Sequence, residues 1–295
     1  MKRNNYHESV LTDEVIKSLE LDRFAHLKRK PRIIDATVAT GGHAIALLNA
    51  GCELLGIDLD ALMLKKAQSR LKALSGLSKL VQGNFRKIDE IAQENGFKEV
   101  EGIIFDLGIS NLHFKQDSRG FSFEDPSAKL DMRLDPKSQA ISAKELLNAL
   151  RVDQLEQVFA QTLDWGNARE IARRVVEKRE AKPFENVEDF LGILGGIQER
   201  KLHSGTRAFL ALRMAVNSEL ENLLEALPKA FGLLVLGGRL IVISFHSGED
   251  AIVKDFFKSA QGARIITPKP LTPSWEEISR NPRSRSARLR VLEKI

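Results

Sequence analysis

Cysteine is nearly missing from this sequence, and long apolar runs are missing altogether. The single cysteine, Cys52, excludes an internal disulfide and the paired cysteines of a zinc finger or a CxxC site. No apolar run reaches the roughly 18 residues that a transmembrane helix requires. The first residues, 1–7, carry charges without the apolar stretch that follows them in a secretory signal. These absences predict a cytoplasmic protein with no membrane partner and no metal site.

The composition is that of a folded protein with an uneven charge. The 295 residues are 43% hydrophobic and 29% charged, which is typical of a globular chain with one large domain or two ordinary ones. Residues 264–295 carry eight basic and three acidic side chains, a surplus equal to the net charge of +5 of the whole chain. A local surplus of this kind predicts contact with a polyanion such as nucleic acid. A solvated tail would have the same composition.

The first third of the chain alternates between strand and helix patterns. Short apolar runs at 33–38, 54–58, 80–81 and 102–106 predict strands, and 41–50, 60–74 and 86–95 predict helices between them. Apolar strands that alternate with helices predict an α/β fold with a parallel sheet buried on both faces.

The next convincing strand, 239–245, follows more than a hundred residues later. An unstructured loop of that length is improbable inside a compact domain, so an inserted helical subdomain is expected. Helical patterns support it, and a long helix is expected to lead back to the sheet; these segments are 142–149, 152–162, 166–179 and 206–227. The predicted organisation is a core in two parts, 1–113 and 205–295, with a substrate-recognition insertion at 114–204.

The turn after the first strand carries the first site signal. Gly41 and Gly42 let the backbone approach a ligand, and the helix that follows favours an anion at its N-terminus. Asp58 ends the next strand, where an acid can accept hydrogen bonds from ribose hydroxyls. Because Ala39 breaks the G-x-G-x-x-G spacing, S-adenosylmethionine is favoured over NAD as the nucleoside cofactor, and an NAD-linked oxidoreductase is a distant alternative.

Two later strands end in polar residues that belong on the same rim. Asp106 ends the fourth strand and His246 follows the fifth, at the edge where open α/β sheets bind ligands. Two segments with polar and aromatic residues, 119–123 and 130–133, are expected to form loops that cover a cleft. For each of these residues, a plain structural role is the alternative.

In their order along the chain, these segments resemble the MraW/RsmH family, which methylates the exocyclic N4 of a cytidine in small-subunit (16S) ribosomal RNA. The resemblance runs nearly end to end, through 7–11, 41–43, Asp58, 106–108, 119–123, 130–133, 211–213, 216–220, 237–239, 245–247 and 281–290.

The resemblance implies a Rossmann-like methyltransferase sheet with a helical insertion subdomain, and S-adenosylmethionine as methyl donor. It implies small-subunit ribosomal RNA as partner and leaves monomer or homodimer open. The sequence departs from the family pattern at several positions, among them Ala39, where glycine is usual, and His113, where glutamine is usual. The implied cofactor contacts are Gly41, Gly42, His43, Asp58, Phe85, Asp106 and His113.

Methyl transfer to an amine needs an acceptor that holds the N–H groups and a route for the departing proton. Asp106 is the predicted acceptor, with Asn111 or His246 assisting. Cys52 lies at the start of a strand, away from the predicted crevice, so no covalent cysteine adduct is expected. The arginines Arg283, Arg285 and Arg288 are expected to hold RNA phosphates. The alternative function is an RNA-binding or ribosome-assembly factor whose cofactor site has weakened or been lost.

Overall fold

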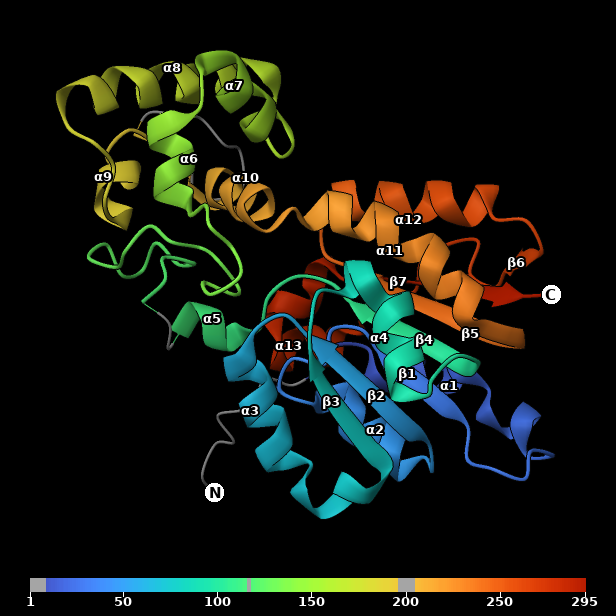
Figure 1. Ribbon diagram of the computed structural model, residues 1–295. Coiled ribbons are helices and arrows are strands. Elements are labelled where there is room, and N and C mark those ends of the chain that lie inside the picture. Colours follow the sequence, from blue (N-terminus) through green and yellow to red (C-terminus); the bar gives the residue numbers. More distant parts are fainter. Residues whose placement is uncertain (1–8, 116–117, 196–204) are drawn as a thin grey trace. The chain divides into compact units, whose positions relative to one another are not determined.

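The computed structural model describes residues 9–115, 118–195 and 205–295 (Figure 1). The chain divides into two compact units. One comprises Met1–Ile109 and Leu220–Ile295, and the other comprises Ser110–Glu219.

The first unit is built on a seven-stranded sheet with the order β3-β2-β1-β4-β5-β7-β6. Neighbouring strands among the first five run parallel, whereas β7 runs antiparallel to both β5 and β6. This sheet confirms the predicted fold class. The strands are β1 (Arg32–Asp35), β2 (Glu53–Asp58), β3 (Ser78–Gln82), β4 (Val100–Asp106), β5 (Leu234–Ser244), β6 (Ala263–Ile265) and β7 (Arg288–Lys294).

Successive strand residues point to opposite faces, and each face is covered by helices (Figure 1). Ile33 packs with residues of α1 and α2, whereas its neighbour Ile34 packs with residues of α4, α11 and α12. Burial on both faces explains the uninterrupted apolar strands. The helices of this unit are α1 (Thr12–Leu19), α2 (Gly42–Asn49), α3 (Ala61–Arg70), α4 (Ile88–Asn95), α11 (Glu219–Leu233), α12 (Ser247–Ser259) and α13 (Trp275–Arg280), and the 3-10 helices are η1 (Leu21–Phe24), η2 (Lys72–Leu77), η3 (Phe85–Lys87) and η4 (Pro282–Ser286).

The second unit is helical and has its own aromatic core. The Phe190 ring lies 6.1 Å from that of Phe159 and 5.3 Å from that of Phe209. The helices predicted for the insertion are present, and α10 clusters with them although sequence analysis placed residues from 205 onward in the core. The helices are α5 (Asn111–Lys115), α6 (Ala143–Ala149), α7 (Val152–Ala160), α8 (Trp165–Ala181), α9 (Val187–Leu191) and α10 (Gly205–Asn217).

Two expectations about elements were wrong. The single helix predicted over 206–227 is divided between α10 and α11, because Ser218 adopts a left-handed φ of 48°. The first strand ends at Asp35 rather than at Val38, because the chain turns there toward α2. The helix α12 was not predicted from the sequence.

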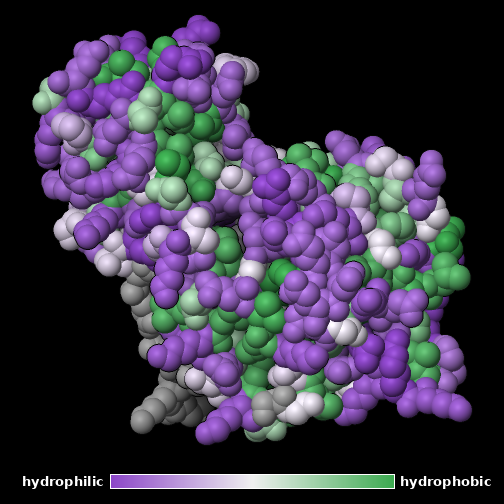
Figure 2. All heavy atoms as spheres, in the orientation of Figure 1, coloured by the Kyte–Doolittle hydropathy of each residue, from purple (hydrophilic) through white to green (hydrophobic). Residues whose placement is uncertain are grey.

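Hydrophilic side chains predominate on the face drawn in Figure 2, with hydrophobic ones between them. Among the described helices, none combines the length and the apolar character needed to cross a bilayer.

Candidate active site

Three aspartates end three adjacent strands of the first unit. Asp58 is the last residue of β2, Asp35 of β1 and Asp106 of β4, and these strands lie side by side in the order β2-β1-β4. Parallel strands place their carboxyl ends at one edge of the sheet, which is the ligand-binding edge of open α/β sheets. The edge contains the two acids expected from the sequence, Asp58 and Asp106, and a third acid, Asp35.

The turn between β1 and α2 is tied directly to Asp58. The N–H group of Ala39 donates to Oδ2 of Asp58 at 2.8 Å, and the N–H of Gly41 donates to the Val38 carbonyl at 2.7 Å. Ala39 adopts a left-handed φ of 46° and Gly41 one of 81°. Ala39 therefore keeps a conformation that suits glycine, which is the residue that the resemblance leads one to expect there.

Gly42 has a different reason for lacking a side chain. A Cβ atom at this position would lie 1.8 Å from Oγ of Ser9. The close approach at Gly42 is thus made by the chain's own N-terminal segment. Gly41 and the start of α2 remain the part of the turn suited to a ligand, because among the described residues no side chain caps this helix.

His43 lies buried between a backbone carbonyl and a carboxylate. Its Nε2 atom lies 2.9 Å from the carbonyl oxygen of Val10, so Nε2 carries a proton and donates it. Its Nδ1 atom lies 3.5 Å from Oδ2 of Asp106. Burial lowers the pKa of His43, although the nearby Asp35 carboxylate opposes this shift. In the neutral ring, Nδ1 therefore presents its lone pair toward Asp106.

Asp35 is almost completely buried, with a relative exposure of 1%. Burial raises its pKa to about 7; His43 and the Thr37 N–H group oppose the shift, and the Asp106 and Asp58 carboxylates add to it. Oδ1 of Asp35 accepts a hydrogen bond from the Thr37 N–H at 3.2 Å. The Thr37 hydroxyl in turn accepts from the Asp106 N–H at 2.7 Å, which locks the ends of β1 and β4 together.

Phe85 lies at the same edge. The N–H of Gly83 donates to the Asp58 carbonyl at 2.9 Å, so the chain that leaves β3 stays beside the end of β2. Two residues later, the Phe85 ring packs edge-on against Phe105, with ring centroids 5.5 Å apart. Phe105 directly precedes Asp106, and Phe85 therefore offers a half-buried aromatic surface close to two of the acids.

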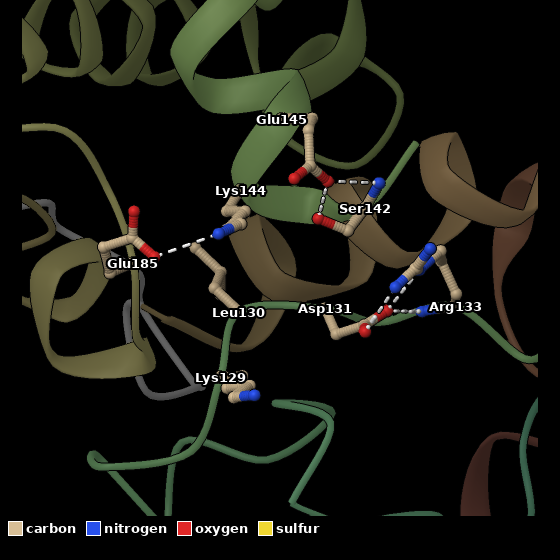
Figure 3. Close-up of a pocket in the computed structure, with 8 residues that line it drawn as sticks. All are labelled: Lys129, Leu130, Asp131, Arg133, Ser142, Lys144, Glu145 and Glu185. Atoms are coloured by element: carbon tan, nitrogen blue, oxygen red, sulfur yellow. Dashed lines mark hydrogen bonds and ion pairs between the residues drawn. The ribbon is translucent and has the colours of Figure 1, made fainter. Parts of the chain in front are cut away.

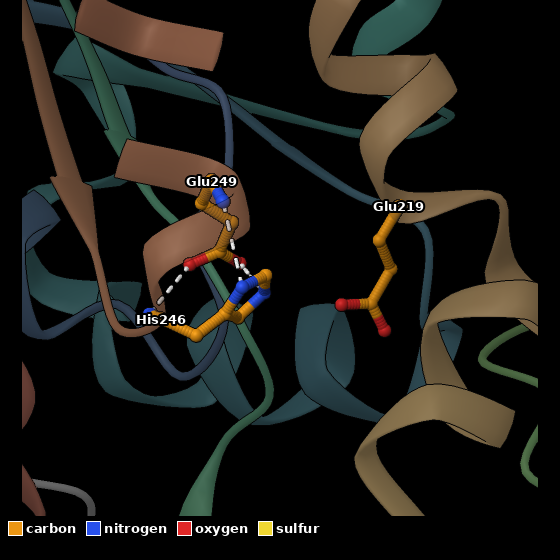
Figure 4. Close-up of side chains that lie close together, drawn as sticks. All are labelled: Glu219, His246 and Glu249. Atoms are coloured by element: carbon orange, nitrogen blue, oxygen red, sulfur yellow. Dashed lines mark hydrogen bonds and ion pairs between the residues drawn. The ribbon is translucent and has the colours of Figure 1, made fainter. Parts of the chain in front are cut away.

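His246 follows β5 as predicted and begins α12. Figure 4 shows its ring turned toward Glu249, with Nε2 lying 3.1 Å from Oε1 and Nδ1 accepting from the Glu249 N–H at 3.4 Å. Oε2 of Glu249 accepts from the Phe245 N–H at 2.8 Å. This capping box gives His246 a structural task, and its assisting catalytic role stays a prediction. The third residue drawn, Glu219, is the first residue of α11 and the last residue of the second unit, and it pairs with Arg213 at 2.8 Å.

Asn111 and His113 fall in the second unit, on α5. The His113 ring is buried against Phe121, with ring centroids 5.3 Å apart. Asn111 begins α5, but its side chain lies outside the described part of the structure. The roles expected of these two residues therefore stay predictions.

The loop 130–133 of the second unit is held by Asn217, the last residue of α10. Its amide oxygen accepts from the Leu134 N–H at 3.0 Å, and its amide nitrogen donates to the Met132 carbonyl at 2.8 Å. Asp131 and Arg133 form an ion pair at 2.7 Å. These contacts give the loop a structural explanation that the sequence alone did not supply.

A cavity of about 340 Å³ also lies in the second unit (Figure 3). Its charged walls are largely paired internally: Lys144 lies 3.0 Å from Glu185, and Arg133 pairs with Asp131. None of the predicted cofactor contacts lines it.

The basic C-terminal segment is partly neutralised within the first unit. Arg290 and Arg288 contact Asp250 at 2.7 and 3.0 Å, and Arg264 contacts Glu293 at 2.6 Å. Arg283 and Arg285 lie exposed on η4. Arg288, which is also predicted to contact phosphate, therefore has a structural partner as well.

The edge of the first unit fits the predicted cofactor in its chemistry. Carboxylates such as Asp58 accept from hydroxyl groups, Asp106 can face an ammonium group, and the uncapped start of α2 suits a carboxylate. S-adenosylmethionine carries all three of these groups together with an adenine ring, for which Phe85 offers an aromatic surface.

Comparison with known proteins gives one family. The model of the MraW methylase family matches residues 4–295. A protein of Thermotoga neapolitana named ribosomal RNA small subunit methyltransferase H is 41% identical, covering 100% of this chain and 98% of its own length. A protein of the same name from Helicobacter pylori is 40% identical, and the match covers 97% of this chain and 97% of that protein.

Among solved structures, the chain is similar to an rRNA methylase from Streptococcus thermophilus, with 15% identity, a TM-score of 0.44, and 94% and 95% of the two chains covered. The assignment rests on the family model and the sequence relatives. The chain belongs to the MraW methylase family, and it is a methyltransferase that uses S-adenosylmethionine as its methyl donor.

Proposed function

We propose that this enzyme methylates the exocyclic N4 of a cytidine in small-subunit ribosomal RNA. The observation that carries the proposal is the full-length similarity to proteins named ribosomal RNA small subunit methyltransferase H. The acidic edge formed by Asp35, Asp58 and Asp106 supports it, because a methyltransferase for an amine needs acceptors for N–H groups. We also place the enzyme in the cytoplasm, as a monomer or homodimer.

The cofactor, when bound, supplies an activated methyl group on a sulfonium. We assign Asp58 to the ribose hydroxyls, Phe85 to the adenine ring, and the turn at 41–43 to the amino-acid end. His113 is a further proposed contact from the second unit. The Ala39 N–H group reaches Asp58 despite the missing glycine, which argues against a decayed site and so against a pure RNA-binding function.

Asp106 is the proposed acceptor for the substrate amine. Its carboxylate would hold the amine N–H groups, so that the nitrogen lone pair points at the methyl group. After transfer the nitrogen must lose a proton. The Nδ1 atom of His43, 3.5 Å from Oδ2 of Asp106, offers a second position for that proton. Asn111 and His246 remain proposed assistants.

The target cytosine must be unpaired, because a base inside a duplex cannot enter such a site. Phosphate contacts would come from Arg283 and Arg285, with a smaller share for Arg288, which contacts Asp250. Such contacts set the register without reading the sequence.

The test is transfer of labelled methyl groups to small ribosomal subunits that lack the mark, followed by mass analysis of the nucleosides. N4-methylcytidine is the expected product. Asp106→Asn should lower the rate by about 10²–10⁴-fold. The matched control is Asp60→Asn at the same edge, where the side chain caps α3 by accepting from the Leu62 N–H at 2.7 Å. Asparagine is also a good cap, so this control should keep its activity.

Calorimetry with S-adenosylmethionine separates the enzyme from the alternative assembly factor. The enzyme should bind the cofactor, whereas absence of binding at millimolar ligand would favour a ribosome-assembly role. Cofactor binding with no methyl transfer to small subunits would instead point to another amine substrate.

A further inference from the structure

A short excursion between β6 and β7 presents an exposed tryptophan among arginines. The excursion, residues 272–288, is closed at its base by two hydrogen bonds of 2.9 Å between the backbones of Leu271 and Leu289. It contains α13 and η4. Its backbone is therefore a defined feature of the first unit.

Trp275, the first residue of α13, has a relative exposure of 82%. Tryptophan is a large side chain that proteins bury to a high degree on average, because its ring carries much apolar area. Ser274 accepts from the Glu277 N–H at 3.2 Å and fixes the start of the helix. Trp275 is thus held outward on an ordered helix with little of its ring covered.

The charges around Trp275 favour an anionic partner. Arg280, Arg283 and Arg285 lie exposed on the excursion. Of the two acids, Glu276 is exposed, and Glu277 accepts from the Leu11 N–H at 2.8 Å. An exposed aromatic ring with arginines beside it is the arrangement with which proteins bind unpaired nucleic acid, by stacking on a base and neutralising phosphates.

The excursion is connected to the candidate active site within the first unit. Glu277 of α13 holds the backbone of Leu11, and the preceding residue, Val10, accepts the hydrogen bond from His43. His43 in turn faces Asp106. A strand of RNA on the excursion would therefore lie on a part of the unit that contacts the acidic edge through three successive interactions.

We propose that the excursion is a docking surface for an unpaired stretch of RNA, with Trp275 stacked on a base and Arg283 and Arg285 against phosphates. The proposal rests on the proposed function, because the RNA is taken to be the methylated substrate. Under this proposal Trp275 positions the RNA at a surface that is separate from the cofactor contacts.

The test uses the fluorescence of Trp275 in the full-length protein. The chain has two tryptophans, so Trp165→Phe leaves Trp275 as the sole one. Titration with a single-stranded oligouridylate should quench it, and a duplex of equal length should quench it far less. Trp275→Ala should weaken binding of the single strand by about five- to a hundredfold, the range expected for one stacked base. Trp275→Phe should keep most of the affinity.

Leu236→Ala is the matched control, because Leu236 is a 74% exposed apolar residue of the first unit that lies on β5, outside the excursion. It should leave RNA affinity unchanged. Equal RNA affinity of Trp275→Ala and the wild type would overturn the docking surface, as would failure of the wild type to bind the oligonucleotide. If the wild type methylates small subunits while Trp275→Ala matches it in KM and RNA affinity, this inference alone fails. Absence of methylation by the wild type would instead refute the proposed function.

Discussion

The Nδ1 atom of His43 lies 3.5 Å from Oδ2 of Asp106, while Nε2 of the same ring donates to the Val10 carbonyl. One imidazole thus joins the N-terminal segment to the proposed amine acceptor. The carbonyl determines which ring nitrogen carries the proton in the neutral form, so the nitrogen that faces the carboxylate is the acceptor. With Asp35 buried nearby, the edge contains groups whose protonation depends on one another.

The raised pKa of Asp35 predicts an unusual dependence of stability on pH. Its folded pKa of about 7 lies above the usual value of 3.8, so the folded state binds more protons between these values. This stabilising contribution is full below pH 3.8 and is lost as the pH rises through 7. Asparagine does not ionise, so Asp35→Asn should not lose stability as the pH rises. At pH 8 the free energy of unfolding of the variant should therefore exceed that of the wild type by at most about 4 kcal/mol.

Urea unfolding of both proteins at a series of pH values between 4 and 8 measures this difference. The lowered pKa of His43 acts in the opposite sense, because its stabilising contribution is lost as the pH falls below 6.5. Because the Asp35 carboxylate opposes the lowered pKa of His43, Asp35→Asn should lower that pKa further, and this change appears at the acidic end of the series. Parallel stability curves for the two proteins would contradict the buried ionisation of Asp35.

Ala39→Gly should stabilise the turn by about 0.5–1 kcal/mol. Alanine at a φ of 46° is strained by about 1–2 kcal/mol, whereas glycine adopts this conformation without that cost but loses more entropy on folding. The hydrogen bond from the backbone of residue 39 to Asp58 would remain. Thermal unfolding should show a raised Tm, and Ala39→Val should show a lowered one. A lower Tm for Ala39→Gly would mean that the backbone is unstrained there.

Glu293→Gln should destabilise the first unit by up to about 3–5 kcal/mol, because it removes the buried carboxylate of Glu293 and leaves the buried Arg239 with Glu20 as its acidic partner. Burial acts to raise the pKa of Glu293, but hydrogen bonds from Arg23, Arg239 and Arg264 outweigh it and lower the pKa to about 2. The contribution is therefore full above pH 4.5 and is lost as the pH falls through 2.

Denaturant unfolding at pH 7 and pH 3 measures both the destabilisation and its dependence on pH. At pH 3, between the two pKa values, the wild type should have lost part of this contribution, whereas Glu293→Gln should be less stable than the wild type at both values. The matched control is Glu90→Gln, whose ion pair with Lys87 is exposed and should contribute less than about 1 kcal/mol.

Two arginines of the basic segment should behave differently in RNA binding. Arg285→Ala should weaken binding and reduce the slope of log affinity against log salt by about 0.7, the value for one phosphate contact on a single strand. Arg290→Ala should leave that slope unchanged and lower stability instead, because Arg290 contacts the buried Asp250 at 2.7 Å. Binding assays at several salt concentrations, with melting curves alongside, distinguish them. An identical slope for Arg285→Ala and the wild type would remove Arg285 from the interface.

The sequence by itself determined the alternation of strands and helices, the insertion and the family. Apolar strands such as 102–106 and the acids at their ends depend on local pattern, which is legible along the chain. The tertiary structure decided the rest. It placed Ser9 against Gly42, paired Arg290 with Asp250 and left Trp275 exposed. These relationships join residues far apart in sequence or depend on what covers a side chain. Burial and pairing arise only when the chain is folded, and no local pattern encodes them.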